Sequence, residues 1–269
     1  MQAAPIAKPS IGICFDADFG ANLEAMVALS LLYGLDNRNE CRVVCLSTTL
    51  ENVTSAGLMA EYLRVYGGRP IPVGMPYEKK PVDTPPLLAA AVDGLELPVK
   101  SWKDTAEPPN ILRNALTAQH DGNAAIVSLG PRTNLHGLLH LYAAKPWVET
   151  KVREVRQVKT DLPEGWPGKG IEVAESDAAG WWIELSPEAF ALWEGTPWAG
   201  KHPLAKALAF AKTTRVAPAM CLAVLGAVRT EEFASPLSEE KKLAAKKLIE
   251  ELVLAKPIPR APRRRPPAV

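Results

Sequence analysis

Two aspartates, Asp16 and Asp18, form the pattern with the clearest chemical potential in this sequence. They are separated by one residue and directly follow residues 11–15, an apolar run that is typical of a buried β-strand. Two carboxylates at a strand end are costly unless a cation or hydrogen-bond donors face them. The pattern therefore favours a metal or sugar site. The alternative is that Asp16 caps the loop while Asp18 is solvated.

Two histidines at helical spacing are a weaker candidate. His136 and His140 are four residues apart, and this spacing allows two imidazoles on one helix to bind a zinc ion. The glutamate of a zinc-protease motif is missing and no third ligand lies near in sequence, so we expect surface or packed histidines. The tryptophans Trp166, Trp181, Trp182 and Trp198 are expected to pack or to form an interface.

The four cysteines do not form the pattern of a disulfide framework. None stands in a CxxC pair, and Cys41 and Cys45 would lie about 13 Å apart on one face of a strand, beyond disulfide reach. We therefore expect buried thiols at Cys14, Cys41, Cys45 and Cys221.

Composition excludes several classes of protein. The chain has 269 residues, of which 47% are hydrophobic, and 31 basic against 30 acidic side chains give a net charge of +1. This balance produces no global field that recruits nucleic acid or a charged membrane. No apolar run approaches the roughly 18 to 20 residues of a transmembrane helix, which predicts a soluble protein. The first nine residues lack a signal-peptide pattern but also fit a chain trimmed before Gln2, so cytoplasmic and secreted or periplasmic locations both stay open.

The elements that must position the aspartates alternate between strand and helix. Strands are predicted at 11–15, 42–46, 124–129 and 152–158, with a short one at 71–73, and helices at 23–33, 52–66, 110–119 and 133–142. Gly67 and Gly68 are expected to end the second helix. This alternation predicts a doubly wound, mainly parallel α/β sheet with helices on both faces.

The C-terminal part of the chain divides into a helical region and a tail. Segment 160–200 is predicted to be loop-rich with a helix starting near Asp177, and helices follow at 204–212, 220–228 and 238–255. We expect one domain over residues 1–255 and an extended tail over 256–269, which has five basic residues, five prolines and no acid. The tail is expected to dock on an acidic protein surface, RNA or anionic lipid, or else to be solvated.

Four segments resemble motifs of one enzyme family. Residues 15–29 (FDADFGANLEAMVAL) resemble the opening signature of the inosine/uridine-preferring nucleoside hydrolases. Three further matches follow in the family's order, at 62–74 (YLRVYGGRPIPVG), 124–135 (AAIVSLGPRTNL) and 221–233 (CLAVLGAVRTEEF). The resemblance covers about residues 10 to 235. It implies the nucleoside-hydrolase fold and Ca²⁺-dependent cleavage of an N-glycosidic bond.

The same resemblance shows that the implied metal site is depleted. It places Asp18 and the backbone carbonyl of Leu129 at two of the Ca²⁺ ligand positions. Two further positions, which carry aspartates in the family, are occupied by Ala25 and Met220. Calcium affinity depends on the number of charged oxygens, so weak binding or none is expected.

The substrate site implied by the resemblance is incomplete as well. Asp16, Asn22, Glu24 and Asn134 fall on substrate-binding positions. Ala219 replaces the histidine that assists the leaving base. The family's ribose-binding asparagine falls near Val173 or Ala174, and a glycine-rich turn is replaced by residues 159–161 (KTD).

Two functions remain after these comparisons of motifs. In the first, the chain is a non-catalytic descendant that serves as a binding or structural subunit, as a homo-oligomer or within a larger assembly, and needs no cofactor. In the alternative, it is an active nucleoside hydrolase with an altered site, in which Asp18 is the general base and Ca²⁺ is held weakly.

Overall fold

A six-stranded parallel sheet forms the centre of the computed structural model, which describes residues 10–66, 70–77 and 82–258. Its strand order is β3-β2-β1-β4-β5-β6, and every neighbouring pair is parallel. The strands are β1 Ile11–Ala17, β2 Cys41–Thr48, β3 Val73–Gly74, β4 Ala124–Leu129, β5 Val152–Gln157 and β6 Gly170–Glu172. The order reverses between β1 and β4, which confirms the doubly wound prediction. In open α/β sheets, ligands bind beyond the carboxyl ends of the strands at such a reversal.

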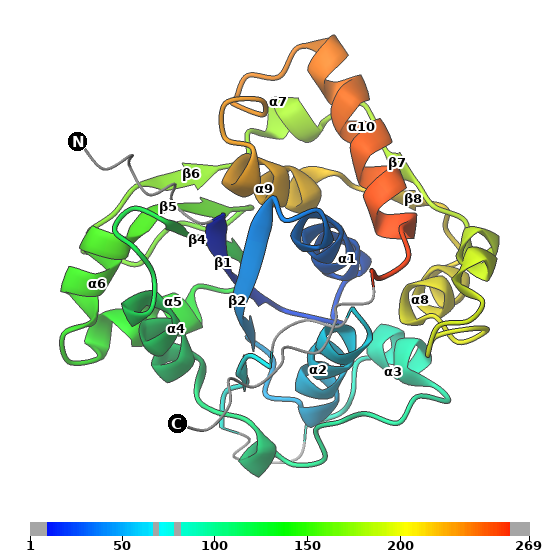
Figure 1. Cartoon of the computed structure of the whole chain (residues 1–269), viewed down its shortest axis with the longest axis horizontal. Helices are drawn as coiled ribbons and strands as arrows, with labels where there is room; N and C mark the ends of the chain where they lie inside the picture. The colour runs from blue at the N-terminus through cyan, green and yellow to red at the C-terminus, as the bar shows by residue number, and fades with distance from the viewer. Residues whose placement is uncertain (1–9, 67–69, 78–81, 259–269) are drawn as a thin grey trace, which may run out of the picture.

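Helices cover both faces of this sheet (Figure 1). On one face lie α1, α9 and α10, and on the other α4, α5 and α6. The helices are α1 Leu23–Asn37, α2 Val53–Val65, α3 Pro86–Val92, α4 Pro108–Thr117, α5 Thr133–His140, α6 Ala144–Lys151, α7 Glu175–Ala178, α8 Pro203–Ala211, α9 Ala219–Val228 and α10 Glu239–Leu254. Short 3₁₀ helices, η1 Trp102–Asp104 and η2 Pro187–Trp193, and an antiparallel pair, β7 Ile183–Glu184 with β8 Arg215–Val216, complete the described elements.

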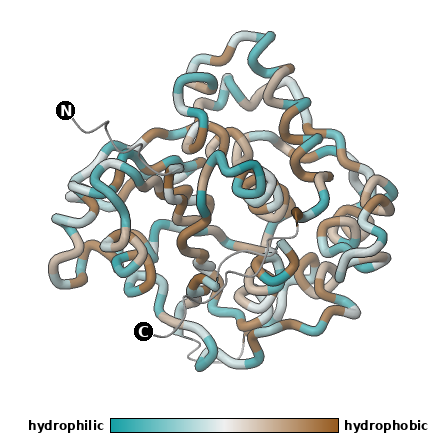
Figure 2. Tube along the Cα trace, viewed as in Figure 1, coloured by the Kyte–Doolittle hydropathy of each residue, from teal (hydrophilic) through white to brown (hydrophobic). Residues whose placement is uncertain are grey.

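The core has two layers because successive side chains of a strand point to opposite faces. Ile13 and Phe15 of β1 pack toward α1 and α9, whereas Cys14 packs toward α4 and α5. The central strands are correspondingly apolar along their length (Figure 2). α1 is enclosed by the sheet and by the helices α8, α9 and α10, which explains why nearly all of its residues are buried.

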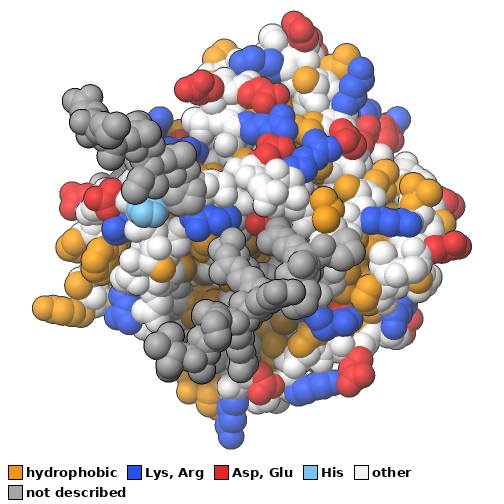
Figure 3. All heavy atoms as spheres, viewed as in Figure 1, with side chains coloured by type: hydrophobic (Ala, Val, Ile, Leu, Met, Phe, Trp, Pro, Cys, Tyr) orange, Lys and Arg blue, Asp and Glu red, His pale blue; other side chains and the backbone are white. Residues whose placement is uncertain are grey.

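The outer surface carries both signs of charge. Acidic and basic side chains are interspersed over the face shown in Figure 3. No helix among the described residues is long and apolar enough to cross a membrane. His136 and His140 are exposed on α5, as expected for surface histidines.

Several element boundaries differ from the sequence predictions. The helix predicted over 133–142 ends at His140, because the backbone becomes extended at Leu141 (ψ 141°). The separate helix α6 begins at Ala144, directly after Ala143, which takes a left-handed conformation (φ 59°). The helix near Asp177 is confirmed as the short α7. The start of the chain before residue 10, Gly67 and Gly68, and the tail beyond residue 258 lie outside the described residues.

All four cysteines are buried, as expected. The structure adds a relationship that spacing along one strand does not reveal. Cys14 and Cys45 are register partners on the adjacent strands β1 and β2. A hydrogen bond with Cys14 and burial raise the pKa of the Cys45 thiol, so the Cys45 sulfur is a neutral packing group at neutral pH.

Candidate functional site

Asp16 lies at the carboxyl end of β1 with its side chain completely buried. Its Oδ1 accepts hydrogen bonds from Ser47 Oγ at 2.5 Å and Asn134 Nδ2 at 2.7 Å. Its Oδ2 has no hydrogen-bond partner among the described residues. Burial raises the pKa of Asp16 to about 6, and the bonds from Ser47 and Asn134 limit the rise. The alternative that Asp16 merely caps the loop is wrong, because its partners are side chains of β2 and α5.

Asn134 holds this part of the site together. It is buried in the first turn of α5, and its Nδ2 donates to Asp16 Oδ1 and to the carbonyl oxygen of Thr48 at 3.1 Å. One amide therefore joins the ends of β1 and β2 to α5. This geometry gives Asn134 a positioning role, and its contact with a substrate stays a prediction.

Asp18 lies two residues beyond Asp16 and is half-buried. Its Oδ1 accepts a hydrogen bond from Asn22 Nδ2 at 2.8 Å, and Asn22 Oδ1 in turn accepts from the backbone N–H of Ala25 at 2.8 Å. Asn22 is thus the N-cap of α1 and a partner of Asp18 at once. Burial raises the pKa of Asp18, the Asn22 bond opposes the rise, and the nearby charge of Glu24 adds to it.

The loop around Asp18 also packs tightly against the end of β4. A Cβ atom added to Gly130 would lie 2.7 Å from the backbone nitrogen of Asp18, a distance that real Cβ atoms do not show. Gly130 directly follows Leu129, whose register partner on β1 is Ala17. The backbone of residues 129–130 is therefore held beside the aspartate loop, as the sequence resemblance implies.

The two depleted ligand positions offer no oxygen from a side chain. Ala25 is completely buried in the first turn of α1, and Met220 is half-buried at the start of α9. Among the described residues, no group of three or more His, Cys, Asp or Glu side chains is arranged to hold a metal ion. Two carboxylates, each already bonded to neutral donors, and a backbone carbonyl fall short of the charged oxygen set that Ca²⁺ prefers. The residues present therefore do not fit a family-type calcium site.

A separate cavity of about 650 Å³ opens at the carboxyl ends of β5 and β6, beside the start of α9. It is large enough for a small molecule. Its wall includes the indole rings of Trp181 and Trp182, and Trp182 is 47% exposed. The full lining consists of Val158, Lys159, Glu172, Val173, Ala174, Glu175, Ala178, Ala179, Gly180, Trp181, Trp182, Ala217, Pro218 and Ala219.

This cavity brings together positions that the sequence resemblance marked as altered. Lys159, Ala219 and the pair Val173 and Ala174 all line it, although they come from three separate segments. Asp16 and Asp18 are not among its lining residues. The tryptophan pair was expected to pack or to form an interface, and nothing in its spacing indicated that it would form a cavity wall.

Comparison with known proteins identifies the fold. No protein-family model and no curated protein matches the sequence. Among solved structures, a purine-preferring ribonucleoside hydrolase from Gardnerella vaginalis is 13% identical with a TM-score of 0.60, and the match covers 90% of this chain and 99% of that one. The plant nucleoside hydrolase PpNRh1 is 12% identical with a TM-score of 0.60, over 92% and 100% of the two chains.

A third match is the type III effector protein XopQ, solved in complex with adenosine diphosphate ribose. It is 10% identical with a TM-score of 0.61, and the match covers 92% of this chain and 95% of that one. At such low identity the matches establish the architecture rather than the activity. The chain has the nucleoside-hydrolase fold.

Proposed function

We propose that this chain is a non-catalytic protein of the nucleoside-hydrolase fold that serves as a binding subunit. The observation that carries the proposal is the pair Ala25 and Met220, which stand where the resemblance places two carboxylate ligands of calcium. Ala25 is completely buried in the first turn of α1, and its methyl side chain supplies no oxygen to a metal.

The surroundings of the remaining aspartates support this proposal. Asp16 accepts hydrogen bonds from Ser47 and Asn134, and Asp18 accepts one from Asn22. Neutral donors therefore stabilise these carboxylates in place of a cation. Asp18 also shares its partner Asn22 with the N-terminus of α1, which ties the carboxylate to the helix cap.

The cavity beside α9 supports a role in binding. It keeps the size of a small-molecule site, and Trp181 and Trp182 provide flat apolar surface that suits a planar ring. Lys159, Glu172 and Glu175 add both signs of charge at its wall. Assembly as a homo-oligomer, or as a subunit of a larger complex, belongs to the same proposal.

The second candidate is an active nucleoside hydrolase that cleaves a ribonucleoside to base and ribose. It is favoured by the preserved pair Asp16 and Asp18 at the end of β1, and by solved structures of the same fold that are described as hydrolases. In this alternative Asp18 would accept the proton of the attacking water, and calcium would be its metal.

Two measurements on the unmodified protein separate the candidates. The proposal expects no calorimetric Ca²⁺ binding at submillimolar concentration and no release of base from inosine or uridine above a buffer control. Calcium-dependent hydrolysis of either nucleoside, well above that control, would overturn the non-catalytic proposal and establish the enzyme.

A further inference from the structure

Helix α5 has a buried face and an exposed face with different chemistry. The buried face carries Asn134, which bonds to Asp16 in the aspartate site. Thr133, His136 and His140 are all exposed. They are three and four positions apart, so they follow one another along the outer side of the helix. The outer side of α5 therefore presents two imidazole rings to the solvent.

The two imidazole rings lie next to each other. The ring centroids of His136 and His140 are 4.4 Å apart, and their planes are inclined by 37°. Two tetrahedral ligands of a zinc ion, each about 2.0–2.1 Å from the metal, are about 3.4 Å apart. Rings at the observed separation are therefore close enough for one ion to bind a nitrogen atom of each.

A hydrogen bond of His140 also leaves the appropriate nitrogen for a metal. His140 Nδ1 lies 2.8 Å from the carbonyl oxygen of His136. A carbonyl oxygen only accepts, so Nδ1 donates and carries the proton of the neutral ring, while Nε2 keeps its lone pair. Proteins orient metal-binding histidines by the same kind of bond. Among the described residues, no hydrogen bond uses Nε2 of either ring.

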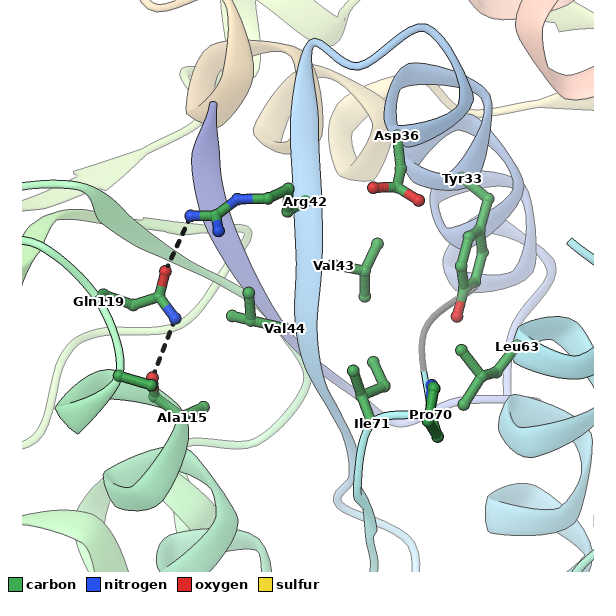
Figure 4. Close-up of a pocket in the computed structure, with 11 residues that line it drawn as sticks. Tyr33, Asp36, Arg42, Val43, Val44, Leu63, Pro70, Ile71, Ala115 and Gln119 are labelled. Carbon is green, nitrogen blue, oxygen red and sulfur yellow. Dashed lines mark hydrogen bonds between the residues drawn. The ribbon is translucent and has the colours of Figure 1, made fainter. Parts of the chain in front are cut away.

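The pocket in Figure 4 shows the contrasting case, in which the fold uses both ends of a polar side chain. Gln119 Oε1 accepts a hydrogen bond from Arg42 Nη2 at 3.2 Å, and Gln119 Nε2 donates to the carbonyl oxygen of Ala115 at 3.1 Å. A ligand that binds this amide must first displace one of these bonds. A metal ion at Nε2 of His136 and His140 displaces none.

Two histidines supply only half of a zinc coordination shell. Structural zinc sites have four ligands, which are cysteine, histidine or carboxylate side chains. Within the described ranges, no group of three or more such side chains could hold a metal ion. All four cysteines are buried and do not reach the outer side of α5. The remaining ligands must therefore come from outside the chain.

We propose that His136 and His140 bind a zinc ion together with the same two histidines of a second copy of this chain. A two-fold axis through the ion brings four imidazole nitrogens together, which is the number that tetrahedral zinc requires. The site gives the proposed homo-oligomer a metal-dependent interface. It does not depend on whether the chain binds calcium or a nucleoside, because Asp16 and Asp18 take no part in it.

The charge of α5 suits contact with its own copy. Under two-fold symmetry, a side chain near the axis faces its own equivalent, so a charged face repels itself. Residues 133–140 (TNLHGLLH) contain no lysine, arginine, aspartate or glutamate. Arg132 precedes the helix, and its Nη1 donates to the carbonyl oxygen of Leu162 at 3.3 Å. Tyr142, which is 92% exposed just beyond His140, adds an aromatic ring of the kind enriched in interfaces.

Zinc binding and molecular mass, measured together, test this proposal. The full chain is produced without a polyhistidine tag and is freed of metal with a chelator. Titration with zinc chloride in a calorimeter should show one ion bound for every two chains. Analytical ultracentrifugation should show that the same amount of zinc doubles the mass of the particle, and that excess EDTA reverses the change.

Three single substitutions supply the variants and their matched control. His136→Ala and His140→Ala each remove two of the four ligands from the assembled site, so each should lower the affinity for zinc by at least about tenfold and abolish the doubling of mass. His120→Ala removes another exposed histidine, which lies outside α5, and should leave both measurements unchanged. All three positions are exposed, so the thermal unfolding midpoint should stay within a few degrees of that of the parent chain.

Three results would overturn the proposal. One ion per chain with an unchanged mass would show that water, rather than a second copy, completes the coordination. Zinc binding that survives both His136→Ala and His140→Ala would place the ion elsewhere. A dimer that persists in EDTA and in both variants would show that the copies meet through another surface. None of these results bears on calcium binding or base release, so failure here is distinct from failure of the non-catalytic proposal.

Discussion

Asn134 donates a hydrogen bond from Nδ2 to Oδ1 of Asp16 over 2.7 Å, across 118 positions of sequence. The bond joins α5 to the end of β1 at the point where the strand order of the sheet reverses. Both residues are buried, so the bond lies where water cannot replace a lost partner. The stability of the aspartate loop therefore depends on an amide in a distant element.

Replacing Asn134 with alanine should destabilise the protein by about 1–3 kcal/mol, because a buried carboxylate loses a donor and the carbonyl of Thr48 loses its amide partner. Chemical denaturation at pH 7 measures this change. Thr133→Ala, at an exposed neighbouring position, is the control and should shift the free energy of unfolding by less than about 0.5 kcal/mol. Equal effects of the two substitutions would contradict the positioning role of Asn134.

Asp16 should make the folded state less stable as the pH rises. Its folded pKa of about 6 lies above its ordinary value of 3.8, so between these values the folded protein binds more protons than the unfolded chain. The stability contributed by the protonated form is present below pH 4 and is lost as the pH passes 6. The free energy of unfolding is therefore lower above pH 6 than below pH 4 by about 3 kcal/mol at most.

The Asp16→Asn variant isolates this effect, because asparagine can accept the same bonds at Oδ1 without the charge. From pH 4 to pH 7, the free energy of unfolding of the parent chain should fall relative to that of the variant. Denaturant midpoints across this range provide the measurement. If the free energy of unfolding of the parent chain instead rose relative to that of the variant, the carboxylate would be stabilised as an anion, as expected if a cation faced it.

Restoring the two carboxylates should restore metal binding before it restores activity. The double variant Ala25→Asp with Met220→Asp supplies the two carboxylates that the resemblance places with Asp18 around calcium, so Ca²⁺ should raise its thermal midpoint and bind in calorimetry. Base release should remain absent, because Ala219 and the missing asparagine leave the base and ribose unheld.

Adding Asp18→Asn to the double variant provides the control, and it should abolish the calcium-dependent rise in midpoint. A double variant that binds no calcium while remaining folded would show that these positions do not form one site. Rapid hydrolysis by the double variant would show that the altered residues around the cavity do not limit activity.

Trp182→Ala should weaken binding in the cavity beside α9. Adenosine, a probe with a planar ring, should quench tryptophan fluorescence of the parent chain and remain intact. The substitution should raise its dissociation constant by about tenfold, since stacking of a base on an aromatic ring contributes 1–3 kcal/mol. Leu192→Ala removes another exposed apolar side chain, outside this cavity, and should leave binding unchanged. Equal binding by all three proteins would exclude stacking on Trp182.

The sequence by itself determined the central strands of the sheet and the place of the aspartate pair. Apolar runs at 11–15, 42–46 and 124–129 are long enough and regular enough to define buried strands. Asp16 and Asp18 follow the first run directly, so their position at a strand end needed no tertiary information. The spaced motifs that resemble nucleoside hydrolases then indicated the fold, which the solved structures confirm.

Boundaries and weakly patterned segments were less predictable. The break between α5 and α6 depends on the extended backbone of Leu141 and the left-handed backbone of Ala143, and no local signal in the sequence indicates either conformation. Segment 160–200 contains β6, β7 and η2, each of which is short and depends on packing against distant parts of the chain.

Only the tertiary structure decided the partners of the key side chains. Asp16 meets Ser47 and Asn134 because three elements, distant in sequence, end at the same edge of the sheet. The cavity wall at Trp182 arises in the same way, because residues from three separate segments meet there. A sequence specifies which side chains are available, but burial, hydrogen bonding and the resulting pKa depend on contacts that form only when those distant segments pack together.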